Sequence, residues 1–194
     1  MPAAPRPELP TLRFATAPEW RRWLAAHHDT TPGVWIQFAK KRAPLATVTH
    51  DQALEIAICF GWIDGQVKPL DETFWRQRFT PRGPRSRWSQ INRAKAEELI
   101  AAGDMQPAGL AQVQAARADG RWDAAYEPSS TITVPDDLQR ALDGEPAAAE
   151  FFATLTGRRR YSFLHRLHHV KTPEARARRI ARYLELLREG KTLN

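Results

Sequence analysis

The sequence predicts an α+β fold: a small, mostly antiparallel sheet covered by helices, followed by a C-terminal helical module. Three observations carry this prediction. The apolar run at 34–39 has the composition of a strand and stands between two segments of helical periodicity. The stretch 62–80 has the pattern of a β-hairpin, with 69–72 near its turn. Beyond residue 134 the apolar residues recur at helical spacing.

Capping-box patterns mark the start of the first two helices. Thr16–Glu19 precedes a helix expected to end near His28, and Thr49–Gln52 precedes one expected to stop at Gly61. The second helix is apolar nearly all round, so we expect it to be buried. Further helices are expected at about 89–102, 107–118, 135–143, 146–153, 161–170 and 173–189.

The expected domain organisation follows from where proline, glycine and serine gather. Four prolines in the first ten residues indicate a flexible arm over 1–15. An α+β domain containing the hairpin is expected over 16–118, and a linker over 119–134. A basic helical module is expected over 135–194.

Composition excludes several classes of protein. The chain has 194 residues, 42% of them hydrophobic, and its seven tryptophans argue against disorder. The single cysteine, Cys59, cannot form an internal disulfide, and its apolar surroundings favour a buried structural role. No apolar run approaches the roughly 20 residues of a membrane helix. The N-terminus lacks the apolar core of a secretory signal, so we expect a cytoplasmic protein without a membrane span.

The positive charge is concentrated at the C-terminal end. The net charge is +7, and residues 158–194 alone hold 11 Lys and Arg against 3 Asp and Glu. Such a segment is suited to nucleic acid, an anionic surface or an acidic protein partner.

Familiar cofactor and metal motifs are absent. There is no phosphate-binding glycine loop, dinucleotide fingerprint, paired-cysteine zinc pattern, HExxH or nucleophile elbow, and we expect no cofactor. His165, His168 and His169 could share one helical face and bind a metal. No cysteine or carboxylate stands nearby to complete a metal shell, so the sequence favours solvated or core-edge histidines.

The hairpin region carries the densest set of functional side chains. Alternation places Arg76, Arg78 and Thr80 on one face, and Trp62 and Asp64 on a common face. If the two faces coincide, Asp64 would be ionised and would orient a guanidinium, leaving other arginines free for an anionic ligand. A structural ion-pair network is an equally weighted alternative. The expected ligand-binding residues are Trp62, Arg76, Thr80, Arg82, Ser86, Trp88 and Asn92.

Several segments together resemble the YdeI/OmpD-associated (bacteriocin-protection) family. They are Lys40–Lys41, Ala53–Gly65, Arg78–Arg82, Ser86–Asn92 and Met105–Gly109, with Val170–Lys191 similar to that family's closing helical module. The resemblance spans about 12–194, with Thr172 and Ala175 as departures. It implies a link to bacterial stress and antimicrobial-peptide tolerance, with an outer-membrane porin as a suggested associate.

Three functional hypotheses remain open. The first is a stress-protection protein that binds a small anionic molecule in a basic, aromatic-lined pocket. The second is an enzyme using the same pocket, with Asp64 as acid or base and Lys40 or Arg78 as electrostatic stabiliser. The third is binding of nucleic acid, an anionic surface or another protein through residues 158–194.

Overall fold

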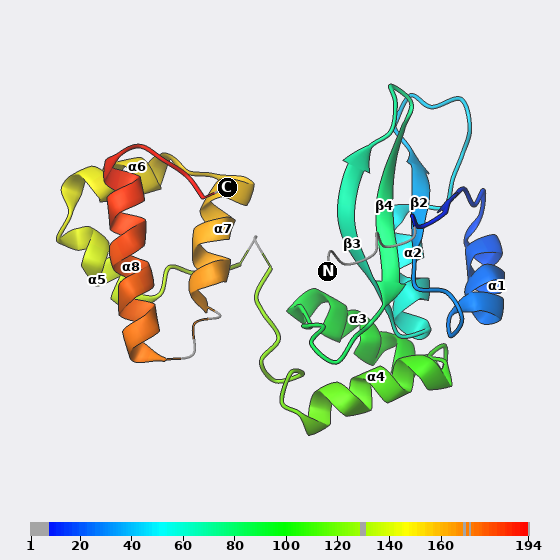
Figure 1. Cartoon of the computed structure of the whole chain (residues 1–194). Coiled ribbons are helices and arrows are strands. Elements are labelled where there is room, and N and C mark those ends of the chain that lie inside the picture. The colour runs from blue at the N-terminus through cyan, green and yellow to red at the C-terminus, as the bar shows by residue number, and fades with distance from the viewer. Residues whose placement is uncertain (1–7, 129–130, 169, 171, 194) are drawn as a thin grey trace, which may run out of the picture. The chain divides into compact units, whose positions relative to one another are not determined.

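The computed structural model describes residues 8–128, 131–168, 170 and 172–193, and these form two compact units (Figure 1). The first contains the chain up to Trp88 together with Asn92–Ala125. The second contains Ser89–Ile91 and the chain from Tyr126 onward. All seven tryptophans belong to the first unit. The α+β class with a C-terminal helical part is confirmed.

A four-stranded sheet organises the first unit. Its strands β1 (Thr11–Leu12), β2 (Val34–Ala39), β3 (Trp62–Pro69) and β4 (Phe74–Pro81) lie in the order β1-β2-β4-β3. The β1–β2 pair is parallel and the other two pairs are antiparallel, so the predicted hairpin is confirmed as β3–β4. Strand β1 was not predicted, because two residues among prolines carry no periodicity. Its pairing with β2 decides its conformation.

Two layers of helices pack behind one face of the sheet. Helices α1 (Ala17–His27) and α2 (His50–Cys59) bury that face together with Val34, Ile36, Phe38 and Phe79. The opposite side of α2 packs, through Leu54 and Ile58, on α3 (Gln90–Ala101) and α4 (Pro107–Ala118). The prediction that α2 is buried is therefore confirmed, because two cores meet on it.

The two predicted capping boxes turn out differently. At Thr49 both hydrogen bonds of the box are present. At Thr16 the hydroxyl makes no capping bond, and the Glu19 carboxylate accepts instead from the backbone N–H of Ala15 at 2.9 Å. That single bond, with Pro18 in the first turn, starts α1.

Residues 119–125, expected in a linker, pack with the first unit. Trp122 is 5% exposed, and its ring lies 4.9 Å from that of Trp88. The turn signals around Gly120 end α4, but the tryptophan two residues later returns the chain to the core. Of the expected arm, residues 1–7 lie outside the described residues, and Thr11–Leu12 form β1.

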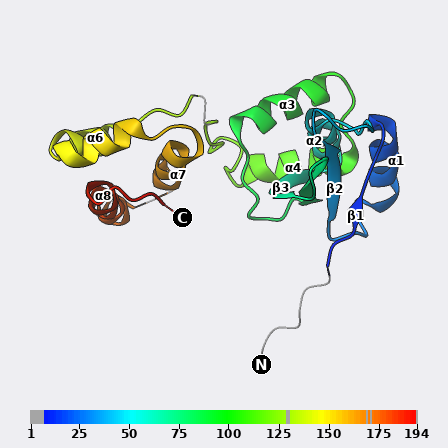
Figure 2. The same ribbon diagram turned by 90° about the horizontal axis from the view of Figure 1, so that it is seen from above.

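The second unit is helical. It consists of α5 (Asp136–Asp143), α6 (Pro146–Thr154), α7 (Gly157–His168) and α8 (Pro173–Arg188), with α6 running across α8 (Figure 2). Its core is made mainly by Leu138, Phe152, Phe163, Leu167 and Leu187. Within the described ranges, none of the helices combines the length and the apolar character needed to cross a bilayer.

Candidate functional site

Cationic side chains gather on the sheet face that is turned away from α1 and α2. Arg76 and Arg78 stand two residues apart on β4, so both point to this side. Lys68 on β3 lies directly opposite Arg76, and Trp35 on β2 lies directly opposite Arg78. We call this surface the basic face, defined by Trp35, Lys68, Arg76, Arg78 and Thr80.

Two of these cations lie over the indole of Trp35. The Arg76 guanidinium carbon is 4.9 Å from the ring centroid and the Lys68 ammonium is 5.2 Å from it. Arg76 also donates a hydrogen bond to the Thr11 hydroxyl at 2.9 Å. The stacking holds both cations in place and keeps Trp35, at 7% exposure, shielded from water.

In the part of the chain that the structure describes, the cations of the basic face form no ion pair with an acid. Among the described residues, none of Lys68, Arg76 and Arg78 forms an ion pair with a carboxylate. The Nε atoms of Arg76 and Arg78 are buried and have no hydrogen-bond acceptor among the residues described. Like charges directly opposite on neighbouring strands destabilise a sheet, and buried unpaired donors do so as well. The sheet therefore tolerates an electrostatic cost at this place.

A depression of about 550 Å³ opens on the basic face. Its volume is in the range of small-molecule sites. Glu8 contributes an acidic group at the same depression. The lining residues are Glu8, Leu9, Pro32, Trp35, Lys68, Arg76, Arg78 and Thr80. The predicted grouping of Arg76, Arg78 and Thr80 on one face is confirmed.

Asp64 lies on the other face of the sheet, so its expected place beside the arginines is wrong. The hairpin register pairs Asp64 with Phe79, whose side chain points into the core. Trp62 and Asp64 do share a face, as expected, but it is the core face. A shift of one residue in register exchanges the two faces of a strand, and alternation alone does not fix the register.

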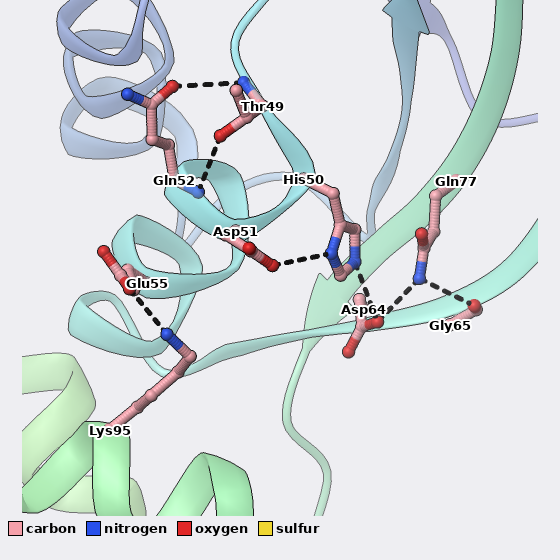
Figure 3. A network of polar contacts seen from close by, with 9 residues as sticks. All are labelled: Thr49, His50, Asp51, Gln52, Glu55, Asp64, Gly65, Gln77 and Lys95. Carbon is pink, nitrogen blue, oxygen red and sulfur yellow. Dashed lines mark hydrogen bonds and ion pairs between the residues drawn. The ribbon is translucent and has the colours of Figure 1, made fainter. Parts of the chain in front are cut away.

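On that core face Asp64 takes part in a polar network with α2 (Figure 3). The Gln77 amide donates to Asp64 Oδ2 at 2.6 Å, and His50 Nε2 lies 3.3 Å from the same oxygen. The other ring nitrogen of His50, Nδ1, is 3.5 Å from an Asp51 oxygen. The hydrogen bond with Asp64 raises the pKa of His50 above its ordinary value, although partial burial opposes the effect.

His50 and Lys40 line a second depression, of about 400 Å³. Its walls include Phe38, Val48 and Trp75, and the Lys40 ammonium donates to the backbone carbonyl of Asp71 at 2.7 Å. The three residues expected to carry catalysis are therefore not brought together. Arg78 belongs to the basic face, Lys40 to this depression, and Asp64 contacts His50 at its side.

The remaining predicted ligand-binding residues lie inside the first unit and do not line the depression on the basic face. Trp62 donates to the His28 carbonyl at 3.0 Å within the core. Arg82 is 5% exposed and stacks 3.6 Å above the buried ring of Trp88. The Ser86 hydroxyl accepts from the backbone N–H of Gly83, and Asn92 is buried on α3.

Three residues of these sites were missed by sequence reasoning. The β3 strand contains a bulge between Asp64 and Val67, and the extra residue moves Lys68 onto the side of Arg76. A glycine within a strand, Gly65, was the available signal for that bulge. The strand pattern of 34–39 gives no sign of the cation contacts of Trp35. The capping-box pattern includes His50 as its second residue and gives no sign of its contact with Asp64.

The C-terminal arginines are largely solvent-exposed, and part of them are engaged locally. Arg182 pairs with Glu185 at 2.8 Å, and Arg188 lies 3.8 Å from Glu145. His165 packs between Tyr126 and Tyr161, at ring distances of 4.9 and 5.1 Å. His168 is exposed, and His169 lies outside the described residues.

Two family models match two separate parts of the chain. Residues 12–112 match the model "Domain of unknown function (DUF8412)", and residues 131–190 match "Bacteriocin-protection, YdeI or OmpD-Associated". The resemblance to the bacteriocin-protection family, expected over 12–194, is therefore confirmed for the C-terminal part. The N-terminal segments that resemble it lie in the region matched by the DUF8412 model. No curated protein and no solved structure matches. The chain belongs to the DUF8412 family through more than half of its length and carries a bacteriocin-protection, YdeI or OmpD-associated domain after it.

Proposed function

We propose that this protein is a cytoplasmic stress-protection protein that binds a small anionic ligand in the depression on its basic face. Arg78 is the main anion-binding residue, with Lys68 and Arg76 beside it. The Thr80 hydroxyl and the Glu8 carboxylate meet the polar groups of the ligand. Asp64 has no direct role in this site.

One observation carries the proposal: three adjacent cations without carboxylate partners in the described parts of the chain. Proteins usually reduce such a cost with a nearby acid. A bound anion would remove the like-charge repulsion between Lys68 and Arg76. It would also accept charge-assisted hydrogen bonds from the guanidinium groups of the two arginines.

The test is mass spectrometry of small molecules released from gently purified protein, followed by binding measurements with the anions recovered. Arg78→Ala should weaken binding by about 10- to 100-fold, the effect of losing a charge-assisted hydrogen bond. The Arg78→Lys variant keeps the charge but lacks the paired N–H donors, so its affinity should lie between those of the parent and Arg78→Ala. Arg22→Ala is the matched control, because Arg22 is exposed on α1. Equal binding by the Arg78→Ala variant and the parent would refute the site.

A second candidate function is acid–base catalysis at His50. The observation that favours it is the Asp64–His50 contact at the edge of a depression that also contains Lys40. A carboxylate behind an imidazole fixes the ring and supports proton transfer by its other nitrogen. The test is turnover: a co-purified molecule consumed by the parent and untouched by His50→Gln supports catalysis. Recovery of that molecule unchanged after long incubation with the parent excludes this candidate.

A further inference from the structure

The charge balance of the basic face narrows the class of its ligand. The depression contains three cations, Lys68, Arg76 and Arg78, and one carboxylate, Glu8. A singly charged ligand would leave positive charge uncompensated. A ligand group with two negative charges would balance the surface.

The spacing of the cations favours a compact group with several acceptor oxygens. Arg76 and Arg78 start about 7 Å apart along β4, and Lys68 starts about 5 Å across from Arg76. Guanidinium groups bind phosphate with paired N–H donors, and a lysine adds a point charge. A carboxylate has only two oxygens and one charge, whereas a phosphate monoester has three terminal oxygens and nearly two charges at neutral pH.

The rest of the depression exceeds what a bare phosphate fills. About 550 Å³ leaves room for the body of a small molecule beside the charged group. Glu8 is an acceptor and Thr80 both a donor and an acceptor, so they suit hydroxyl groups.

We infer that the ligand of the basic face is a phosphate monoester of a small hydroxylated molecule, bound as the dianion by Arg76, Arg78 and Lys68. This inference rests on the proposed anion-binding function and gives that anion its chemical class.

Methyl phosphate and methyl sulfate test the inference, because they have the same shape and differ in charge. The phosphate ester gains its second charge near pH 6, whereas the sulfate ester stays a monoanion. Binding is followed by NMR of the Trp35 indole in the full chain. At about pH 8 methyl phosphate should bind about tenfold more tightly, and at about pH 5 the two affinities should converge. Methyl sulfate also corrects for titration of the protein itself, including His50.

Each outcome is decisive. Tighter binding of methyl phosphate at the higher pH, lost in Arg78→Ala and kept in Arg22→Ala, supports the inference. Equal binding of both esters at about pH 8 overturns the phosphate assignment and leaves anion binding intact. Binding of neither ester overturns both proposals. Binding of methyl phosphate that survives in Arg78→Ala places the anion elsewhere and also overturns the inference.

Discussion

Gly109, the third residue of α4, lies where that helix packs closely against the end of α2. A β-carbon at this position would lie 2.3 Å from the Cys59 carbonyl oxygen and 2.5 Å from the Met105 sulfur. The Gln106 N–H also donates to the same Cys59 carbonyl, at 3.1 Å. This oxygen belongs to the backbone and is fixed by that hydrogen bond, so it cannot move away as a flexible side chain would.

Replacing Gly109 with alanine is expected to destabilise the first unit. In an ordinary helix interior the same change stabilises by about 1 kcal/mol. Here the helices must separate by at least 0.7 Å to bring the new contact to the 3.0 Å limit. Overpacking of this kind costs about 1–3 kcal/mol. The free energy of unfolding should therefore fall by up to about 2 kcal/mol, and the urea midpoint should fall by up to about 1 M.

Tryptophan fluorescence during urea unfolding is the suitable assay, because every tryptophan lies in the first unit. Ala111→Gly, at an exposed position of the same helix, is the control for helix propensity and should cost about 1 kcal/mol. A Gly109→Ala protein that is more stable than the parent would refute the close-packing argument.

Three further predictions concern pH and salt. Because Asp64 raises the pKa of His50, the interaction between them stabilises the fold fully below about pH 6.5 and is lost as pH rises through the pKa of His50 in the folded protein. The urea midpoint should therefore fall as pH increases, and Asp64→Asn should make it depend less on pH. The hydrogen bonds from Arg176 lower the pKa of Asp137, so the second unit should lose this stabilisation only as pH falls below about 4. Arg176→Met should lower the stability of the second unit by about 1–3 kcal/mol and speed hydrogen exchange in α8, and unchanged exchange would contradict this. If residues 158–194 bind nucleic acid, the affinity for a short duplex should fall steeply with salt, and an unchanged affinity without this segment would exclude the idea.

Some of the segments that resemble the bacteriocin-protection family contact one another in the fold. Two of them, Ala53–Gly65 and Met105–Gly109, meet backbone to backbone where α4 crosses the end of α2 at Cys59. Gly61 has a φ of +74°, and a β-carbon there would lie 2.8 Å from the Ala108 carbonyl oxygen. Gly61 and Gly109 therefore allow the close packing of α4 against the end of α2.

The sequence by itself determined the elements. Capping signals, prolines and 3.6-residue periodicity are local, so α2, α4, β2 and the β3–β4 hairpin were predictable within a few residues. Alternation also grouped Arg76 with Arg78, because both belong to one strand and their relative orientation needs no partner.

Tertiary structure decided which side chains meet. The register of β3 against β4 placed Asp64 beside His50 and away from Arg78, and the bulge after Asp64 brought Lys68 to the basic face. Trp62, Trp88 and Arg82 became core residues because other elements cover them. Strand register and the covering of these side chains depend on contacts between segments far apart in the chain, which the local pattern does not encode. Gly65 signals an irregular strand, but only the pairing of β3 with β4 fixes the bulge and the face that Lys68 takes.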